Sequence, residues 1–300
     1  MNEHGYHRPV LLQESVDGLN IKPNGVYVDA TFGGGGHSRE ILTRLDKGKL
    51  IGFDQDPDAK ANVPEDPRFK LVDQNFRRMA NWLGFLGIQK VDGILADLGV
   101  SSHQFDSSER GFSIRFDGPL DMRMDLSKTK TAAEVVNNYS QEELSRILRY
   151  YGEVQQPMKI AGSLLKWRPM ETTQELKKAV LPFAPRMKEH KFFAQVFQAL
   201  RIEVNEELDA LNEFLLQTAG LLAPGGRLVI ISYHSLEDRM VKDFMRSGNM
   251  EGVQQKDFFG NLIRPFKPLS AKPIAPEENE IAHNPRARSA RMRIAERISD

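Results

Sequence analysis

The chain has no cysteine, no long hydrophobic run and no net charge, and each absence narrows what the protein can be. Without cysteine there can be no disulfide and no cysteine-ligated zinc, which is consistent with the cytoplasmic localisation that we expect. No stretch is long and apolar enough to span a membrane, and the first residues show no signal-peptide pattern, so we expect no membrane association. A neutral chain can contact nucleic acid only through local basic patches.

The most informative segment combines two short apolar runs with a run of four glycines. Val26–Val28 ends in Asp29, Gly33–Gly36 follows, residues 38–45 have a helical pattern, and residues 50–53 end in Asp54. This order predicts strand, glycine turn, helix and strand, with an acid at the carboxyl end of each strand. We interpret it as the start of a nucleotide-binding α/β sheet, in which ligands bind beyond the carboxyl ends of the strands.

Two cofactor classes, dinucleotides and S-adenosylmethionine, use such a segment. Asp54 lies about 20 residues past the loop, where an acid can accept hydrogen bonds from the ribose hydroxyls of either cofactor. Asp29 favours S-adenosylmethionine, because a carboxylate attracts its ammonium and sulfonium groups but repels a pyrophosphate. Glycines that merely form turns are the remaining alternative.

The spacing of further strands predicts an inserted domain. Residues 91–97 form another apolar run that ends in an acid, Asp97, and residues 226–232 form a strongly β-branched one. About 130 residues separate these runs, whereas a crossover needs only a dozen or more. Two capping-box sequences, at residues 140–143 and 172–175, precede helical patterns inside this stretch. We expect an open, mostly parallel α/β domain of residues 1–105 and 196–300, interrupted by a helical domain of residues 106–195.

Polar residues that follow the strands are the candidates for chemistry. Asp97, Ser101 and Ser102 follow one strand, and Tyr233 and His234 follow another. The serines could instead close an ordinary polar turn. Ser235 could cap a helix, with Glu237 and Asp238 in its first turn, whereas Tyr233 and His234 could stack on a flipped base.

Three other features of the sequence carry weaker indications. A metal site of His4, His7 and His37 is disfavoured, because no regular spacing groups them with carboxylates, and we expect no metal. Residues 247–285 have the composition of a loop excursion, and residues 290–296 alternate like a final strand. Five arginines near the end could form a phosphate-binding stripe or a solvated strand face: Arg286, Arg288, Arg291, Arg293 and Arg297.

Several motifs in unbroken order resemble those of one family. They are Thr31–His37, Asp97–Ser102, Glu109–Ser113, Gly118–Asp125, Phe197–Ile202, His234–Arg239 and Asn284–Ser289. The sequence resembles the bacterial ribosomal RNA small subunit methyltransferase H family, also called MraW. The resemblance implies a class I methyltransferase that uses S-adenosylmethionine and carries an inserted helical domain. It also implies N4-methylation of a cytidine in the decoding region of 16S ribosomal RNA, within ribosome biogenesis.

The resemblance also implies residue roles. Cofactor contacts fall on Gly35, Gly36, His37, Asp54, Phe76, Asp97 and Gln104. Asp97, Ser101 and His234 are our catalytic candidates, since an acceptor near the amine would stabilise the charge that grows on nitrogen.

The expected partner is 16S ribosomal RNA, within the small ribosomal subunit, and a homodimer stays open. The missing cysteine fits methylation at nitrogen, because carbon-5 methylation of cytosine usually needs a cysteine nucleophile. A methyltransferase for small molecules or proteins, or a non-catalytic RNA-binding protein with this fold, remain the alternatives.

Overall fold

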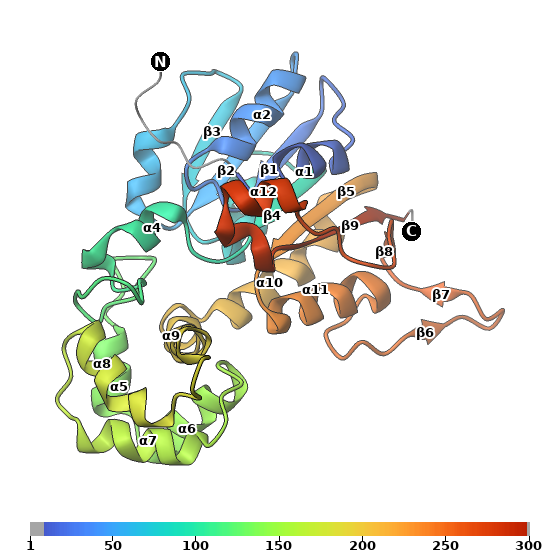
Figure 1. Ribbon diagram of the computed structural model, residues 1–300. Helices are drawn as coiled ribbons and strands as arrows, with labels where there is room; N and C mark the ends of the chain where they lie inside the picture. Colours follow the sequence, from blue (N-terminus) through green and yellow to red (C-terminus); the bar gives the residue numbers. More distant parts are fainter. Residues whose placement is uncertain (1–8, 299–300) are drawn as a thin grey trace. The chain divides into compact units, whose positions relative to one another are not determined.

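A computed structural model describes residues 9–298, which divide into two compact units (Figure 1). Met1–Gly99 and Leu208–Asp300 form one unit, here the sheet unit, and Val100–Glu207 forms the other, here the helical unit. The helical unit is wider than the expected 106–195. Its core includes Val196, Leu200 and Val204 of helix α9 (Glu189–Asn205), so the expected boundary at 195 divides a helix. His4 and His7 lie outside the described residues.

The described part of the sheet unit contains a seven-stranded sheet with the order β3-β2-β1-β4-β5-β9-β8. The first five strands in this order are parallel, and β9 pairs antiparallel with β5 and with β8. The strands of this sheet are β1 (Val26–Asp29), β2 (Lys49–Asp54), β3 (Phe69–Asp73), β4 (Val91–Asp97), β5 (Leu222–Ser232), β8 (Phe266–Pro268) and β9 (Arg291–Arg297). The predicted mostly parallel α/β sheet is therefore confirmed.

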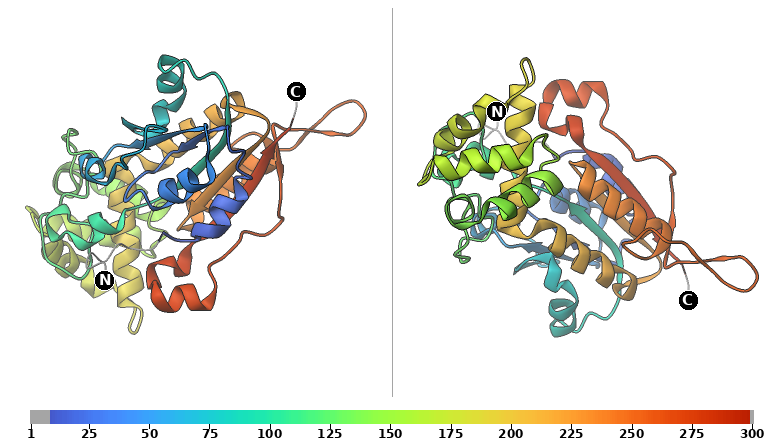
Figure 2. Two further views of the ribbon diagram at one scale, coloured as in Figure 1. Left: turned by 90° about the horizontal axis from the view of Figure 1, so that it is seen from above. Right: turned by 90° about the horizontal axis from the view of Figure 1, so that it is seen from below.

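Helices cover both faces of the sheet, as the two views of Figure 2 show. One face packs on α3 (Met79–Phe85), α10 (Glu207–Leu221) and α11 (Ser235–Ser247), which contribute Leu83, Phe214 and Phe244 to its core. The other face packs on α1 (Leu12–Gly18) and α2 (Gly36–Arg44), with Val16 and Ile41. Apolar residues on both faces explain why the central strands are continuous hydrophobic runs.

The C-terminal part of the chain returns to the sheet as an antiparallel strand. Met292 and Ala295 of β9 are buried, and β9 lies between β5 and β8, so the predicted final strand is present as an inner strand. The expected loop excursion at 247–285 contains a small hairpin of β6 (Gln255–Lys256) and β7 (Leu262–Ile263), then β8 and helix α12 (Glu278–His283). The 3-10 turn η5 (Pro285–Ser289) leads into β9.

The helical unit has its own hydrophobic core. Its elements are α4 (Ser102–Asp106), η3 (Ser108–Arg110), α5 (Ala132–Asn138), α6 (Gln141–Tyr150), α7 (Pro157–Lys166), α8 (Thr173–Val180), η4 (Leu181–Phe183) and α9. The capping boxes predicted at Ser140 and Thr172 are both formed, and each fixes a helix start. Asn205 at the end of α9 is buried and bonds the backbone of Met122 and Met124, which anchors the charged segment that precedes α5.

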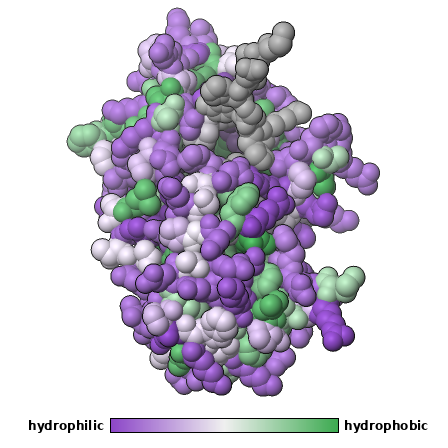
Figure 3. Space-filling model, turned by 60° about the vertical axis from the view of Figure 1, so that its left-hand side comes forward, coloured by the Kyte–Doolittle hydropathy of each residue, from purple (hydrophilic) through white to green (hydrophobic). Residues whose placement is uncertain are grey.

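Among residues 9–298, no helix combines the length and the apolarity needed to cross a membrane. On the face drawn in Figure 3, hydrophobic residues lie in small groups among hydrophilic ones.

Candidate cofactor and active site

Three acids lie at the carboxyl ends of three neighbouring strands. Asp29 ends β1, Asp54 ends β2 and Asp97 ends β4, and β1 lies between the other two strands. The chain leaves β1 towards β2 on one side and later adds β4 on the other, so this is the switch point at which open α/β sheets bind ligands. The sequence pattern and the topology therefore place the candidate site at the same edge of the sheet.

Asp54 holds the glycine loop against the end of β2. The Gly33 N–H donates to one carboxyl oxygen of Asp54 at 2.7 Å, and the Asp56 N–H donates to the other at 2.8 Å. Burial raises the pKa of Asp54 to about 6, and these two backbone donors oppose the rise. Each oxygen keeps a second lone pair, so the carboxylate can still accept from ribose hydroxyls, as the sequence predicts.

The glycines of the loop differ in what an added side chain would meet. Gly35 has a φ of 73°, and a Cβ there would lie 2.8 Å from the Phe32 ring. A Cβ on Gly36 would lie 2.1 Å from Pro9, whereas a Cβ on Gly34 would meet nothing within 4 Å. Packing inside the protein therefore fixes Gly35 and Gly36, and open space lies beside Gly34. Gly35 and Gly36 remain predicted cofactor contacts.

Asp29 is buried, and its carboxylate joins the start of the glycine loop to helix α2. It is 2% exposed, and its carboxyl oxygens accept from the Thr31 N–H at 3.2 Å and from the Ser38 hydroxyl at 2.7 Å. Burial raises its pKa to about 6. The hydrogen bonds of Asp29 thus go to the protein, and its charge is what it can offer to a ligand.

Asp97 is the most perturbed carboxyl group of the three. The Tyr233 hydroxyl donates to one of its oxygens at 2.8 Å, and its own N–H donates to the Thr31 hydroxyl at 2.6 Å. Burial raises the pKa of Asp97 to about 7, the Tyr233 bond opposes this rise, and the charges of Asp29, Glu237 and Glu280 add to it. The side chain is still 23% exposed, so a reacting group can reach it.

The imidazole ring of His37 lies between the Val10 carbonyl and Asp97 and is neutral. Its Nε2 lies 3.1 Å from the Val10 carbonyl oxygen, and burial lowers its pKa to about 4. Nδ1 lies 3.9 Å from an Asp97 oxygen, which is too long for a hydrogen bond. Since the ring is uncharged near neutral pH, this contact is no ion pair. The predicted cofactor residue His37 therefore holds the N-terminal segment against the loop.

Phe76 follows β3 at the same edge of the sheet. It begins η2 (Phe76–Arg78), and its ring packs edge-to-face on Phe214 at 5.1 Å. Its partial exposure leaves it available to flank an adenine ring, as we predict. Beside it, the Asn75 amide donates to the Gln55 side chain at 2.8 Å, which joins the ends of β2 and β3.

Ser101 and Gln104 belong to the helical unit and cap α4. The Gln104 N–H donates to the Ser101 hydroxyl at 3.2 Å, and the Ser101 N–H donates to the Gln104 side chain at 3.0 Å. This reciprocal pair is a capping box. Ser101 is therefore a helix cap, whereas the alternative that we left open was an ordinary polar turn. Gln104 is 4% exposed.

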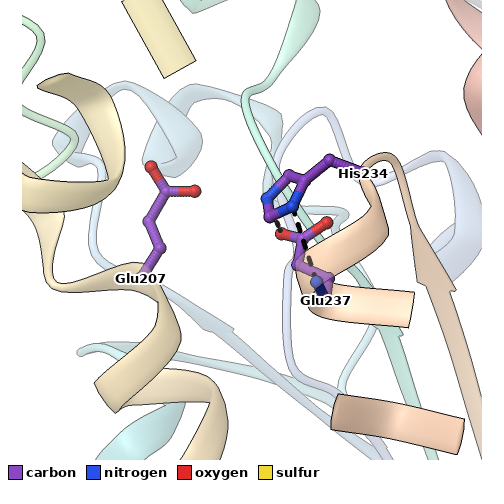
Figure 4. Close-up of side chains that lie close together, drawn as sticks. All are labelled: Glu207, His234 and Glu237. Carbon is purple, nitrogen blue, oxygen red and sulfur yellow. Dashed lines mark hydrogen bonds and ion pairs between the residues drawn. The ribbon is translucent and has the colours of Figure 1, made fainter. Parts of the chain in front are cut away.

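His234 caps helix α11 with its ring (Figure 4). Its Nδ1 accepts from the Glu237 N–H at 3.5 Å, and its Nε2 lies 3.3 Å from a Glu237 carboxyl oxygen. Glu237 reaches back to the Tyr233 N–H at 3.0 Å. The cap is thus His234, where Ser235 was an alternative, and only 8% of the His234 side chain is exposed for the stacking that we predicted. Glu207, also drawn, belongs to the helical unit.

The five arginines do not form one stripe. Arg293 makes a two-pronged pair with Asp238 at 2.7 and 3.0 Å, and Arg297 donates to backbone carbonyls, including that of Ala219 at 2.9 Å. Arg286, Arg288 and Arg291 are exposed. Arg293 and Arg297 are therefore engaged within the fold, and the three exposed arginines stay candidates for phosphate contacts.

The donor and acceptor set of the sheet unit fits an adenosyl cofactor with a cationic centre. Asp54 offers acceptors for hydroxyls, the loop leaves open space beside Gly34, and Asp29 and Asp97 place negative charge at the strand ends. Sequence reasoning missed the bond from Tyr233 to Asp97, because residues 136 positions apart reveal no contact by spacing alone.

A mostly parallel sheet with these acids at its switch point defines a class I, Rossmann-like methyltransferase that uses S-adenosylmethionine. The chain belongs to the MraW methylase family, whose model matches residues 4–298. Ribosomal RNA small subunit methyltransferase H of Parabacteroides distasonis is 55% identical over 298 residues, which cover 98% of each chain. The protein of the same name from Bacteroides thetaiotaomicron is 55% identical over 300 residues, 99% of each chain.

A solved structure of an rRNA methylase from Streptococcus thermophilus also aligns with the chain. It is 12% identical, covers 99% of this chain and 100% of its own, and has a TM-score of 0.43. A likeness at this level supports neither a fold nor a function.

Proposed function

We propose that this protein methylates N4 of a specific cytidine in the decoding region of 16S ribosomal RNA. The observation that carries the proposal is Asp97, a partly exposed carboxyl group with a pKa of about 7 at the carboxyl end of β4. The names of relatives about 55% identical over nearly the whole chain support ribosomal RNA as the substrate. When bound, S-adenosylmethionine supplies the methyl group.

Binding of the cofactor would rest on residues of the sheet unit. Asp54 would accept from the ribose hydroxyls while it keeps the Gly33 N–H bond, and Phe76 would flank the adenine ring. Gly34 would let the loop backbone approach, and Gly35, Gly36 and His37 would hold that loop in shape. Gln104 stays a proposed contact from the helical unit.

Asp97 would act on the target amine. An exocyclic amine of cytosine is a weak nucleophile, because its lone pair is delocalised into the ring, and positive charge grows on nitrogen as the new N–C bond forms. One oxygen of Asp97 is occupied by the Tyr233 hydroxyl, so the other oxygen would accept an N–H of the amine. An N–H bond then breaks and an O–H bond forms on Asp97. A pKa near 7 suits a base that works at neutral pH.

Ser101 and His234 are weaker candidates for a direct part in the reaction, because each side chain already accepts a backbone N–H at a helix N-terminus. We keep them as positioning residues: Ser101 fixes the backbone after Asp97, and His234 fixes the backbone around Tyr233. The helical unit is our proposed substrate-recognition domain, and the exposed Arg286, Arg288 and Arg291 are proposed phosphate contacts.

The direct test uses small ribosomal subunits and 16S RNA from a strain that lacks the gene. Purified protein and S-adenosylmethionine should restore one N4-methylated cytidine, identified by mass analysis of nucleosides and mapped to a fragment of the decoding region. A product at carbon 5 or on another nucleotide would refute the assignment of N4. Methylation of free nucleosides in preference to ribosomal RNA would favour the small-molecule alternative.

A further inference from the structure

The hairpin of β6 and β7 carries two exposed phenylalanines at its tip. It projects from the sheet unit in Figures 1 and 2. Phe258 is 97% exposed and Phe259 is 85% exposed, which are extreme values for an aromatic side chain. Neither residue packs in a core cluster, and the fold as described gives them no structural role. Two adjacent aromatic side chains exposed together at the tip of a projecting hairpin form a candidate binding surface.

The turn that presents these rings is ordered by its own hydrogen bonds. The carboxylate of Asp257 accepts from the Phe259 N–H and the Asn261 N–H, both at 2.8 Å, and from the Asn261 amide at 3.0 Å. The Asp257 N–H donates to the Asn261 carbonyl at 2.9 Å. The bond from the Asn261 side chain and the backbone donors lower the pKa of Asp257, so it stays ionised. The tip is therefore preorganised, and little entropy is lost when it binds.

The rings leave their faces accessible. Their centroids are 5.7 Å apart and their planes meet at 86°, so one ring presents its edge to the other. In this geometry each ring keeps at least one face uncovered. Flat, accessible aromatic faces are what proteins offer to unstacked bases of single-stranded RNA.

The charge around the hairpin favours a polyanion. The hairpin of residues 253–264 holds two cationic side chains, Lys256 and Arg264, and one acid, Asp257, and Lys267 and Lys272 follow it, while the whole chain is neutral. The Asp257 carboxylate is hydrogen-bonded to donors within the turn itself. A stable protein partner would need about 1,000 Å² or more of shared interface, which two rings on a narrow hairpin do not supply. Base stacking needs only the ring faces and nearby cations.

We propose that the hairpin of residues 253–264 is an RNA-contact element that stacks Phe258 and Phe259 on unpaired bases of the substrate. The proposal rests on ribosomal RNA as the substrate and adds a binding element outside the predicted substrate domain. It assigns to the hairpin affinity for RNA and no part in cofactor binding or in the reaction at Asp97.

The test measures binding of labelled 16S RNA to the full chain, without cofactor and without a methylation step. Phe258→Ala and Phe259→Ala should each weaken binding about fivefold to a hundredfold, the range for loss of one stacked base. Phe85→Ala is the matched control, because Phe85 of α3 is 80% exposed and also has an aromatic neighbour, Trp82, at 5.7 Å. It should leave RNA affinity unchanged.

Two further variants separate stacking from other contacts. Phe258→Leu with Phe259→Leu keeps apolar area but removes the ring faces, so RNA affinity should fall nearly as far as with alanine. Lys256→Gln should reduce the salt dependence of binding by about one phosphate contact. Ultraviolet cross-linking should place nucleotides on the peptide that carries the two phenylalanines.

Several outcomes would overturn the proposal. RNA affinity unchanged in the alanine variants would do so, and so would full affinity in the leucine variant, which would indicate a general hydrophobic contact. Loss of self-association by sedimentation, or of binding to anionic vesicles, with RNA affinity intact would assign the tip to a second copy or to a membrane. Because methylation is not the readout, failure of the N4 assignment would leave these results interpretable.

Discussion

The hydrogen bond from Tyr233 to Asp97 can be tested by removing one oxygen atom. Tyr233→Phe deletes the hydroxyl that donates to the Asp97 carboxylate at 2.8 Å and keeps the ring. Because this donor stabilises the ionised form, its loss must raise the pKa of Asp97. A hydrogen bond to a charged group contributes about 1.5–3 kcal/mol. At 1.36 kcal/mol per pKa unit, this is about one to two units.

The lower end of this range applies, because Asp97 is 23% exposed and water can replace part of the bond. The pKa should rise from about 7 to roughly 8. If the carboxylate is the base, the single-turnover rate at saturating S-adenosylmethionine should rise with pH through this pKa. The rising limb should then move by about one unit in the variant, with a rate about fivefold lower at pH 7 and nearly equal at pH 9.

The matched control is Tyr139→Phe in the helical unit. Tyr139 donates to the Glu203 carboxylate at 2.7 Å, so the variant loses the same kind of bond at another place. Its pH profile should keep the wild-type midpoint. The reasoning would be refuted by an unshifted limb in Tyr233→Phe, or by a rate that stays low at every pH. The first result would show that Tyr233 does not tune Asp97, and the second that the hydroxyl has another function.

Three further predictions concern the acids and the loop. Asp97→Asn should lower the single-turnover rate about 100-fold or more. Because burial raises the folded-state pKa of Asp97 to about 7, the wild-type protein loses stability as pH rises from about 4 to about 7, and this loss is constant above that. Asparagine removes the loss, so the variant should gain about 2–4 kcal/mol of unfolding free energy at pH 8, with less gain at pH 5 in denaturant titrations. Asp54→Ala should weaken S-adenosylmethionine binding by about 1–3 kcal/mol in calorimetry, and unchanged affinity in the folded variant would remove Asp54 from the cofactor site. Gly35→Ala should lower thermal stability, because Gly35 has a φ of 73° and a Cβ there would meet the Phe32 ring. Gly34→Ala should keep the fold and weaken cofactor binding. Equal effects of the two variants would contradict our assignment of Gly35 to packing and of Gly34 to ligand approach.

Local patterns in the sequence predict the sheet and its acids. Strand, glycine turn and helix follow one another within 30 residues, so short-range rules place Asp29 and Asp54 at strand ends correctly. The same rules predict the caps at Ser140 and Thr172, because a capping box is complete within four residues.

Contacts between distant residues are what the sequence does not reveal. Tyr233 meets Asp97 because β5 pairs with β4, and Pro9 limits Gly36 because the N-terminal segment packs on the loop. Neither contact leaves a periodic signal. The roles of Ser101 and His234 differ from expectation for a local reason, since serine and histidine side chains next to a helix start can satisfy its free N–H groups.

The insertion between β4 and β5 also sets the order in which a growing chain can fold. The two strands are neighbours in the sheet, yet residues 98–221 separate them. At a synthesis rate of about 5–20 residues per second, β4 would wait roughly 6–25 seconds for its partner. During that interval β4 would be an edge strand with Ile94, Leu95 and Ala96 unprotected, which is a template for aggregation. The helical unit has its own core and is complete before residue 222, so it can fold in the meantime. Nascent chains halted just before residue 222 are therefore the form of this protein most in need of a chaperone.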